Sequence, residues 1–138
     1  MVEVGERPKM RVLVIDDDDI ARELLCSTLR AAGHETFELQ SSIGATRCIH
    51  EHKVDAVVLD VMLPTVNGDK LARMFRHGSG GEQLAIVLVS SRPKPELRQL
   101  ATLAQADDVV TKSEIQRGLV VAVQRAVVRR AALRRRDG

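Results

Sequence analysis

The sequence predicts an α/β fold in which helices cover both faces of a parallel sheet. Short continuous apolar runs, such as residues 11–15 and 84–89, are rich in β-branched residues, which is typical of strands buried on both faces. These runs alternate with segments of helical periodicity at intervals of about 20 to 25 residues. Polar side chains stand where several runs end, and open parallel sheets bind ligands at the carboxyl ends of their strands.

The first half of the chain contains two predicted strand–helix pairs. The strand over residues 11–15 is followed by four aspartates, the last of which, Asp19, is expected to cap a helix. Gly33 is expected to end that helix, because glycine readily takes the left-handed conformation found after helices. The second pair is a strand over residues 35–39 and a helix from Ser42 to about Glu51.

The second half repeats the pattern three times. The expected elements are a strand over residues 54–59, a turn over 64–68 followed by a helix, a glycine-rich loop over 78–81, a strand over 84–89, a helix from Pro95 to about Leu103, and a strand over 108–111. Ser113 and Gln116 form a predicted capping box at the start of the last helix. The apolar stripe of that helix consists of Leu119, Val120, Val123 and Val127.

Composition limits the function classes. The chain is 44% hydrophobic but contains two Phe and no Tyr or Trp, so we expect an aliphatic core and no base-stacking nucleic-acid platform. Cys26 and Cys48 lack metal-ligand spacing and are expected to be reduced structural thiols. We find neither an apolar run long enough to span a bilayer nor a signal-peptide core, and expect a cytoplasmic protein without membrane contact.

Charge is distributed unevenly along the chain. The net charge of +2 divides into +6 from Arg117 onward and −4 before it, and an acidic body suits a cation site. The arginine-rich end could bind nucleic acid or an acidic partner by charge, or it is a solvated helix end or a linker. We favour the second interpretation and do not expect nucleic acid as a partner, because no base-reading motif follows. The expected organisation is a flexible leader over residues 1–9, one domain over 10–130 and a basic tail or linker over 131–138.

Candidate site residues follow four of the predicted strands. Asp16 and Asp17 follow the first strand, and Asp60, Ser90 and Lys112 follow three others. Taken singly, each could be a loop acid, a helix cap or a surface residue. Taken together, three carboxylates at one sheet edge would repel one another, and a hard divalent cation such as Mg²⁺ would relieve that repulsion. A carboxylate nucleophile, a metal, an ammonium and a hydroxyl are the groups that phosphoryl transfer to an aspartate needs.

Four segments, in this order and spacing, resemble response-regulator receiver domains. They are Val12 to Asp17, Val57 to Pro64 with Gly68 after it, Ile86 to Ser91, and Val109 to Lys112. The resemblance covers about residues 10–130. It implies a flavodoxin-like (βα)5 fold with a five-stranded sheet in the order 2-1-3-4-5.

The resemblance also implies a site, a cofactor and a partner. The implied cofactor is Mg²⁺, and the donor is a histidine kinase or a phosphotransfer protein. The domain would be regulatory, changing its partner-binding face rather than turning over external substrates, and would be a monomer or a weak dimer. The implied roles are Asp60 as phosphoacceptor, Asp17 as a direct Mg²⁺ ligand, Asp16 as a ligand through water, the Met62 carbonyl as a further ligand, Ser90 as a hydrogen-bond donor to the phosphoryl group, Lys112 as its ion-pair partner, and Gly68 at a positive φ.

Two positions depart from the family pattern. Val109 stands where many receivers have Tyr or Phe, and Ser113 stands where the family usually has a cis proline. A cis bond before a non-proline residue costs about 3 kcal/mol, so we expect a trans bond and a rearranged loop. An alternative function is therefore a constitutive interaction module that keeps the fold without using phosphorylation. A Mg²⁺-dependent phosphatase is disfavoured, because Met62 rather than a second acid lies two residues after Asp60.

Overall fold

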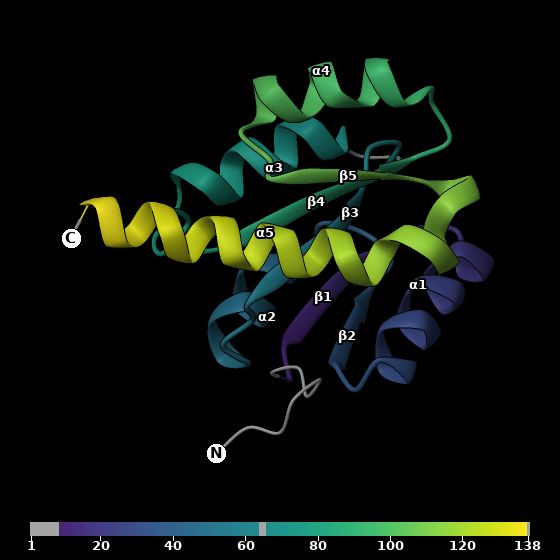
Figure 1. Ribbon diagram of the computed structural model, residues 1–138. Helices are drawn as coiled ribbons and strands as arrows, with labels where there is room; N and C mark the ends of the chain where they lie inside the picture. The colour runs from purple at the N-terminus through teal and green to yellow at the C-terminus, as the bar shows by residue number, and fades with distance from the viewer. Residues whose placement is uncertain (1–8, 64–65, 138) are drawn as a thin grey trace.

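A computed structural model describes residues 9–63 and 66–137 of the chain. Five parallel strands form one sheet in the order β2-β1-β3-β4-β5, with helices on both faces (Figure 1). This arrangement confirms the predicted fold class and strand order. The elements are β1 (Arg11–Ile15), α1 (Asp19–Ala31), β2 (Glu35–Leu39), α2 (Ala45–Glu51), β3 (Ala56–Asp60), α3 (Gly68–His77), β4 (Ala85–Ser90), α4 (Lys94–Ala104), β5 (Asp108–Thr111), a 3₁₀ turn (Lys112–Glu114) and α5 (Ile115–Asp137).

Two hydrophobic cores lie on the two faces of the sheet, and both are aliphatic except for Phe75 and the partly buried Phe37 in one of them. In β1, Leu13 and Ile15 belong to the core that α3 and α4 cover, whereas Val12 and Val14 belong to the core under α1 and α5. Strands β3 and β4 are buried at every position, as the continuous apolar runs predict. Each central strand therefore contributes to both cores, and this fixes the register at which its last residue reaches the sheet edge.

The starts of two helices differ from the prediction. Asp18, not Asp19, is the N-cap of α1, because Asp18 has extended backbone angles and its side chain accepts from the Ile20 amide at 3.3 Å. Helix α2 begins at Ala45 rather than Ser42, after Gly44 in the left-handed conformation at φ 81°. The end of α1 is as predicted, with Gly33 at φ 92° just beyond it.

The predicted capping box at Ser113 is wrong. Lys112–Glu114 forms a 3₁₀ turn before α5, and the Ser113 hydroxyl pairs with the Thr111 hydroxyl at 3.2 Å. The chain turns more tightly here than an α-helical start would, which takes Ser113 out of the N-cap position. The Lys112–Ser113 peptide bond is trans, as expected.

Several predicted boundaries shift slightly. Strand β3 begins two residues later than expected and includes Asp60, and β4 includes Ser90. Helix α5 continues as a helix to Asp137, so the basic residues from 131 onward extend it. The predicted leader, apart from Lys9, and the start of the predicted turn at residues 64–65 lie outside the described residues.

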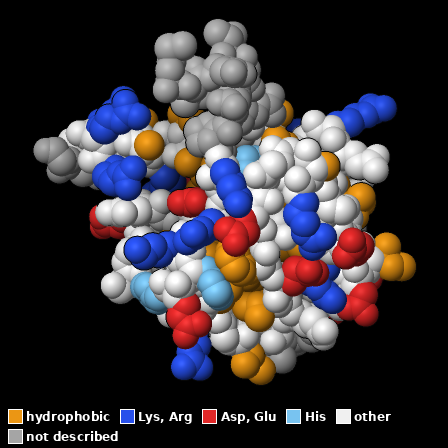
Figure 2. All heavy atoms as spheres, turned by 90° about the horizontal axis from the view of Figure 1, so that it is seen from below, with side chains coloured by type: hydrophobic (Ala, Val, Ile, Leu, Met, Phe, Trp, Pro, Cys, Tyr) orange, Lys and Arg blue, Asp and Glu red, His pale blue; other side chains and the backbone are white. Residues whose placement is uncertain are grey.

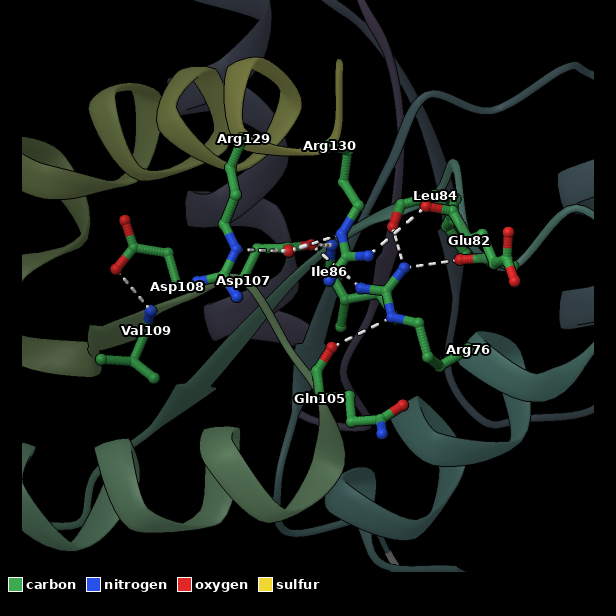
Figure 3. A network of polar contacts seen from close by, with 11 residues as sticks. Arg76, Glu82, Leu84, Ile86, Gln105, Asp107, Asp108, Val109, Arg129 and Arg130 are labelled. Atoms are coloured by element: carbon green, nitrogen blue, oxygen red, sulfur yellow. Dashed lines mark hydrogen bonds and ion pairs between the residues drawn. The ribbon is translucent and has the colours of Figure 1, made fainter. Parts of the chain in front are cut away.

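A buried carboxylate joins four segments at the amino-terminal edge of β4 and β5 (Figure 3). The side chain of Asp107 is fully buried and lies 3.0 Å from the guanidinium of Arg76 and 2.6 Å from that of Arg130. It also accepts from the backbone amide of Ile86 at 2.9 Å, and Arg129 approaches at 3.4 Å. This network fastens α3 and the carboxyl-terminal half of α5 to the sheet.

Most other ion pairs lie on the surface. Arg11 pairs with Glu35 at 3.3 Å and Arg47 pairs with Glu51 at 3.0 Å, and these side chains are largely exposed. Figure 2 shows the same intermixing of basic and acidic side chains on the face seen from below. Exposed pairs of this kind contribute little to stability, typically below 1 kcal/mol each. None of the helices in the described part of the chain combines the length and apolar character that crossing a bilayer requires.

Cys26 is expected to make stability depend on alkaline pH. Both cysteines are free, as predicted, and burial raises the pKa of the Cys26 thiol from 9.0 to about 11. The folded state keeps this thiol protonated while the unfolded chain loses the proton, so stability is lost as the pH rises from about 9 to about 11. Between pH 8 and 10.5 the free energy of unfolding should fall by about 1 to 2 kcal/mol more in the wild type than in Cys26→Ala. Urea unfolding followed by circular dichroism measures the difference, and equal pH dependence in both proteins would contradict it.

Candidate functional site

The candidate residues come from four strand ends that meet at one edge of the sheet. Asp16 directly follows β1, Asp60 is the last residue of β3, Ser90 is the last residue of β4, and Lys112 directly follows β5. Because all five strands are parallel, their carboxyl ends share this edge. The topology therefore brings together residues that are up to 96 positions apart in the chain, from 16 to 112.

The carboxylates of Asp16, Asp17 and Asp60 form one cluster. One oxygen of each lies within 4.8 Å of the other two. The ammonium of Lys112 lies 3.2 Å from Oδ2 of Asp60 and 3.3 Å from Oδ2 of Asp16. Asp16 and Asp60 are buried, whereas Asp17 is exposed to solvent. The cluster is therefore a recessed acidic site with one accessible acid and one fixed positive charge.

Burial and neighbouring charges shift the pKa values of Asp16 and Lys112. Burial is the largest influence on the Asp16 carboxyl and raises its pKa; the Asp60 charge raises it further, against the opposing Asp18 amide and Lys112 ammonium. For Lys112, burial acts to lower the pKa, but attraction to Asp60 and Asp16 prevails and raises it. Lys112 thus stays protonated at neutral pH, when it carries the charge that an incoming anion requires.

The donor set fits a hard divalent cation. Oδ2 of Asp16 is buried and makes no hydrogen bond within the described chain, although Lys112 lies near it. The single Lys112 ammonium balances only one of the three carboxylates, and a divalent cation would relieve the remaining repulsion. The ligand atoms are all oxygens, which Mg²⁺ prefers over nitrogen or sulfur. The residues present are therefore compatible with Mg²⁺.

Ser90 and Met62 border the carboxylate cluster. The buried Ser90 hydroxyl accepts from the Arg92 amide at 3.1 Å, and its neighbour Val89 pairs with Asp60 in the sheet register. The Met62 amide donates to Oδ1 of Asp60 at 3.0 Å, while its side chain is exposed. The structure thus brings Lys112 into contact with Asp16 and Asp60, holds Asp60 by the Met62 amide, and places Ser90 at the end of the neighbouring strand.

Gly68 is needed for a different reason from the predicted positive φ. It is the first residue of α3, it is not among the positive-φ glycines, and its amide donates to the Val61 carbonyl at 2.8 Å. A Cβ at this position would overlap the backbone carbonyl oxygen of Asp60 and lie 2.7 Å from the Cα of Val61. The loop that follows Asp60 therefore packs so closely on α3 that only glycine fits.

Val109, the position where the family pattern has an aromatic residue, lies in the core. It is 5% exposed and packs in the core that contains Leu97 and Ala101 of α4. A small aliphatic side chain in this position leaves no large ring to change its orientation.

Sequence reasoning missed Arg22, which lies behind the acidic cluster. Its guanidinium donates to the backbone carbonyl of Asp16 at 2.8 Å and to the carboxylate of Asp19 at 2.6 Å. An arginine in the second turn of a helix that follows a ligand loop points back toward that loop, because helical side chains lean toward the amino terminus. That spacing is the signal that could have identified it.

A cavity lined by other residues lies away from the acidic cluster. It has a volume of about 680 Å³ and lies between α2, α3 and the end of α5, where its walls include Ile49, Phe75 and Arg134. None of the clustered acids lines it. The acidic cluster and this cavity are therefore separate features of the fold.

Two curated response regulators are similar to this chain in sequence. The chain is 35% identical over 123 residues to the response regulator MprA of Mycobacterium sp. strain KMS, covering 89% of this chain and 52% of that protein. It is 33% identical over 129 residues to the DNA-binding response regulator MtrA of Mycobacterium tuberculosis, covering 94% and 53%. The chain thus spans about half the length of these curated relatives.

Structural comparison and the family model agree with these relatives. The chemotaxis protein CheY4 of Vibrio cholerae superposes with a TM-score of 0.78 at 23% identity, covering 86% of this chain and 99% of that one, which shows the shared fold. The sequence-family model of the response regulator receiver domain matches residues 12–124. This stretch contains the three clustered acids and Lys112. The chain therefore belongs to the family of response regulator receiver domains of two-component systems.

Proposed function

We propose that this chain is a phosphorylation-dependent switch in which Asp60 accepts a phosphoryl group with the help of Mg²⁺. The observation that carries the proposal is the convergence of three carboxylates within 4.8 Å, with the Lys112 ammonium 3.2 Å from Asp60. The proposed donor is a histidine kinase or a phosphotransfer protein, since the receiver family interacts with histidine kinases. The proposed setting is the cytoplasm.

The cation would be held by the acids of the cluster and by the Met62 backbone carbonyl. In this proposal Asp17 binds it directly, Asp16 binds it through water, and Asp60 supplies the third carboxylate. When bound, Mg²⁺ supplies charge neutralisation for the phosphoryl oxygens. The charge balance supports this assignment, because the one ammonium of Lys112, 3.3 Å from Oδ2 of Asp16, balances only one of the three clustered carboxylates.

The residues of the chain carry out the transfer itself. An Asp60 oxygen attacks phosphorus in line, the new oxygen–phosphorus bond forms, and the phosphorus–nitrogen bond to the donor imidazole breaks. The imidazole nitrogen leaves with the bonding electron pair. Lys112 shifts its ion pair from the Asp60 carboxylate to a phosphoryl oxygen, and Ser90 turns its hydroxyl to donate to another.

The switch would act through the segments attached to Ser90 and Lys112. Drawing the Ser90 hydroxyl toward the phosphoryl group breaks its contact with the Arg92 amide, which leads into α4. The proposed readout is therefore a shift of the loop after β4 and of the face formed by α4, β5 and α5. Since Val109 is a small core residue, that shift is expected to proceed without an aromatic side chain changing its position.

Intact mass after acetyl phosphate treatment tests the proposal. The wild type is expected to gain one phosphoryl group in the presence of Mg²⁺ and none after chelation, because Asp60 needs the cation to accept the anionic group. Asp60→Asn should gain none, since an amide is not a nucleophile. Asp108→Asn, at the opposite end of β5, is the matched control and should react like the wild type.

Two outcomes would contradict the proposal. A wild-type protein that stays unmodified with Mg²⁺ present would remove the phosphoacceptor role, and modification of Asp60→Asn would assign it elsewhere. In the first case the constitutive interaction module explains the protein better than a phosphorylation switch does. Val109 and Ser113, which depart from the family pattern, favour that function. Sustained hydrolysis of p-nitrophenyl phosphate would instead indicate a phosphatase.

A further inference from the structure

Arg22 is a largely buried arginine that the proposed phosphoryl transfer does not use. It lies in the second turn of α1, and 12% of its side chain is exposed. One guanidinium nitrogen donates to the backbone carbonyl of Asp16 at 2.8 Å, and another donates to Asp19 at 2.6 Å. The third nitrogen, Nε, lies 3.5 Å from the carboxylate of Glu38 on β2. Arg22 thus joins the loop after β1 to both α1 and β2.

The contact with Asp16 fixes the peptide unit that leads to Asp17. The other groups of Asp16 are already held: its amide donates to the Leu39 carbonyl at 3.2 Å, and its Oδ1 accepts from the Asp18 amide at 2.9 Å. Because the peptide unit is planar, holding the Asp16 carbonyl also sets the direction in which the chain continues. Within the described part of the chain, the exposed Asp17 side chain makes no hydrogen bond or ion pair, so its direction depends on this backbone.

We propose that Arg22 is a positioning residue for the cation, because its hold on the Asp16 carbonyl keeps the Asp17 carboxylate turned toward Asp16 and Asp60. This inference rests on the proposed function. Arginine suits the task because its planar fork serves several acceptors at once, whereas the single ammonium of a lysine serves fewer. The three acceptors come from the loop, from α1 and from β2, so the loop is held against two rigid elements.

Three variants of the full chain separate positioning from general stability. Arg22→Met removes all three contacts, and Arg22→Lys keeps a single ammonium. Arg30→Met is the matched control: Arg30 also pairs with Glu38, at 3.2 Å, and bonds the Thr36 hydroxyl, but it does not contact the loop after β1. Titration calorimetry with Mg²⁺ alone should show about tenfold weaker binding for Arg22→Met, as for other residues that orient metal ligands. Arg22→Lys should fall between, and Arg30→Met should bind like the wild type.

A second measurement without any metal tests the same contact. Amide hydrogen exchange at Asp17 and Asp18 should be faster in Arg22→Met than in the wild type, and unchanged in Arg30→Met, because only the first variant releases the loop. A wild-type protein that fails to bind Mg²⁺ would contradict the proposed function. A wild-type protein that binds Mg²⁺, with Arg22→Met binding it equally well, would overturn the role of Arg22 alone. Unchanged amide exchange in Arg22→Met would overturn it as well.

Discussion

Replacing Asp107 by alanine is expected to lower the free energy of unfolding by about 3 to 5 kcal/mol. The substitution leaves Arg76, 6% exposed, without its carboxylate partner. Burial already lowers the pKa of Arg76, and attraction to Asp107 is the main influence that opposes it. The carbonyls of Leu84 and Gln105, at 2.6 and 3.0 Å, still accept from Arg76 but carry no negative charge to balance it. Urea unfolding followed by circular dichroism gives the measurement.

Two further variants serve as comparisons for the stability loss expected of Asp107→Ala. Glu51→Ala removes an exposed carboxylate that pairs with Arg47 in α2 and should change the free energy of unfolding by less than about 1 kcal/mol. A domain of this size has a total stability of about 5 to 15 kcal/mol, so the loss expected for Asp107→Ala is a large share of it. Asp107→Asn retains an acceptor oxygen and is therefore the milder variant. If Asp107→Ala and Glu51→Ala lost equal stability, the network around Asp107 would not hold α3 and α5 to the sheet as described.

Gly68→Ala is expected to lower the free energy of unfolding by about 3 kcal/mol and to weaken Mg²⁺ binding. The new Cβ would overlap the backbone carbonyl oxygen of Asp60, and a backbone atom cannot move aside as the end of a flexible side chain does. The loop after β3 must then move away from α3. That movement would displace the Met62 amide, which holds Oδ1 of Asp60 at 3.0 Å. Thermal unfolding with and without Mg²⁺ measures both effects.

Gly118→Ala provides the control for this substitution. Gly118 lies within α5, and a Cβ there would meet nothing within 4 Å. Alanine in a helix interior is more favourable than glycine by about 0.5 to 1 kcal/mol, so this variant should be more stable than the wild type, with unchanged Mg²⁺ binding. Equal behaviour of the two variants would show that the loop after Asp60 tolerates a side chain on α3.

The predicted fold and the observed fold agree because the hydrophobic patterns that predict the strands are strong and local. A continuous apolar run such as Val57–Leu59 can be satisfied only where both faces of a strand are covered. The helix starts were less well predicted, because adjacent residues with similar side chains compete for one position. Asp18 and Asp19 both can cap a helix, and the backbone angles, which the sequence does not specify, selected Asp18.

The sequence by itself determined the strands and helices, the aliphatic character of the core and the identity of the acids and the lysine at the strand ends. These follow from hydrophobic periodicity and from residue chemistry, which act over a few neighbouring positions. Only the tertiary structure decided which groups touch. The close packing of Gly68 on the Asp60 carbonyl, the hold of Arg22 on Asp16 and the arginines around Asp107 depend on segments distant in sequence that meet only when the parallel sheet has assembled.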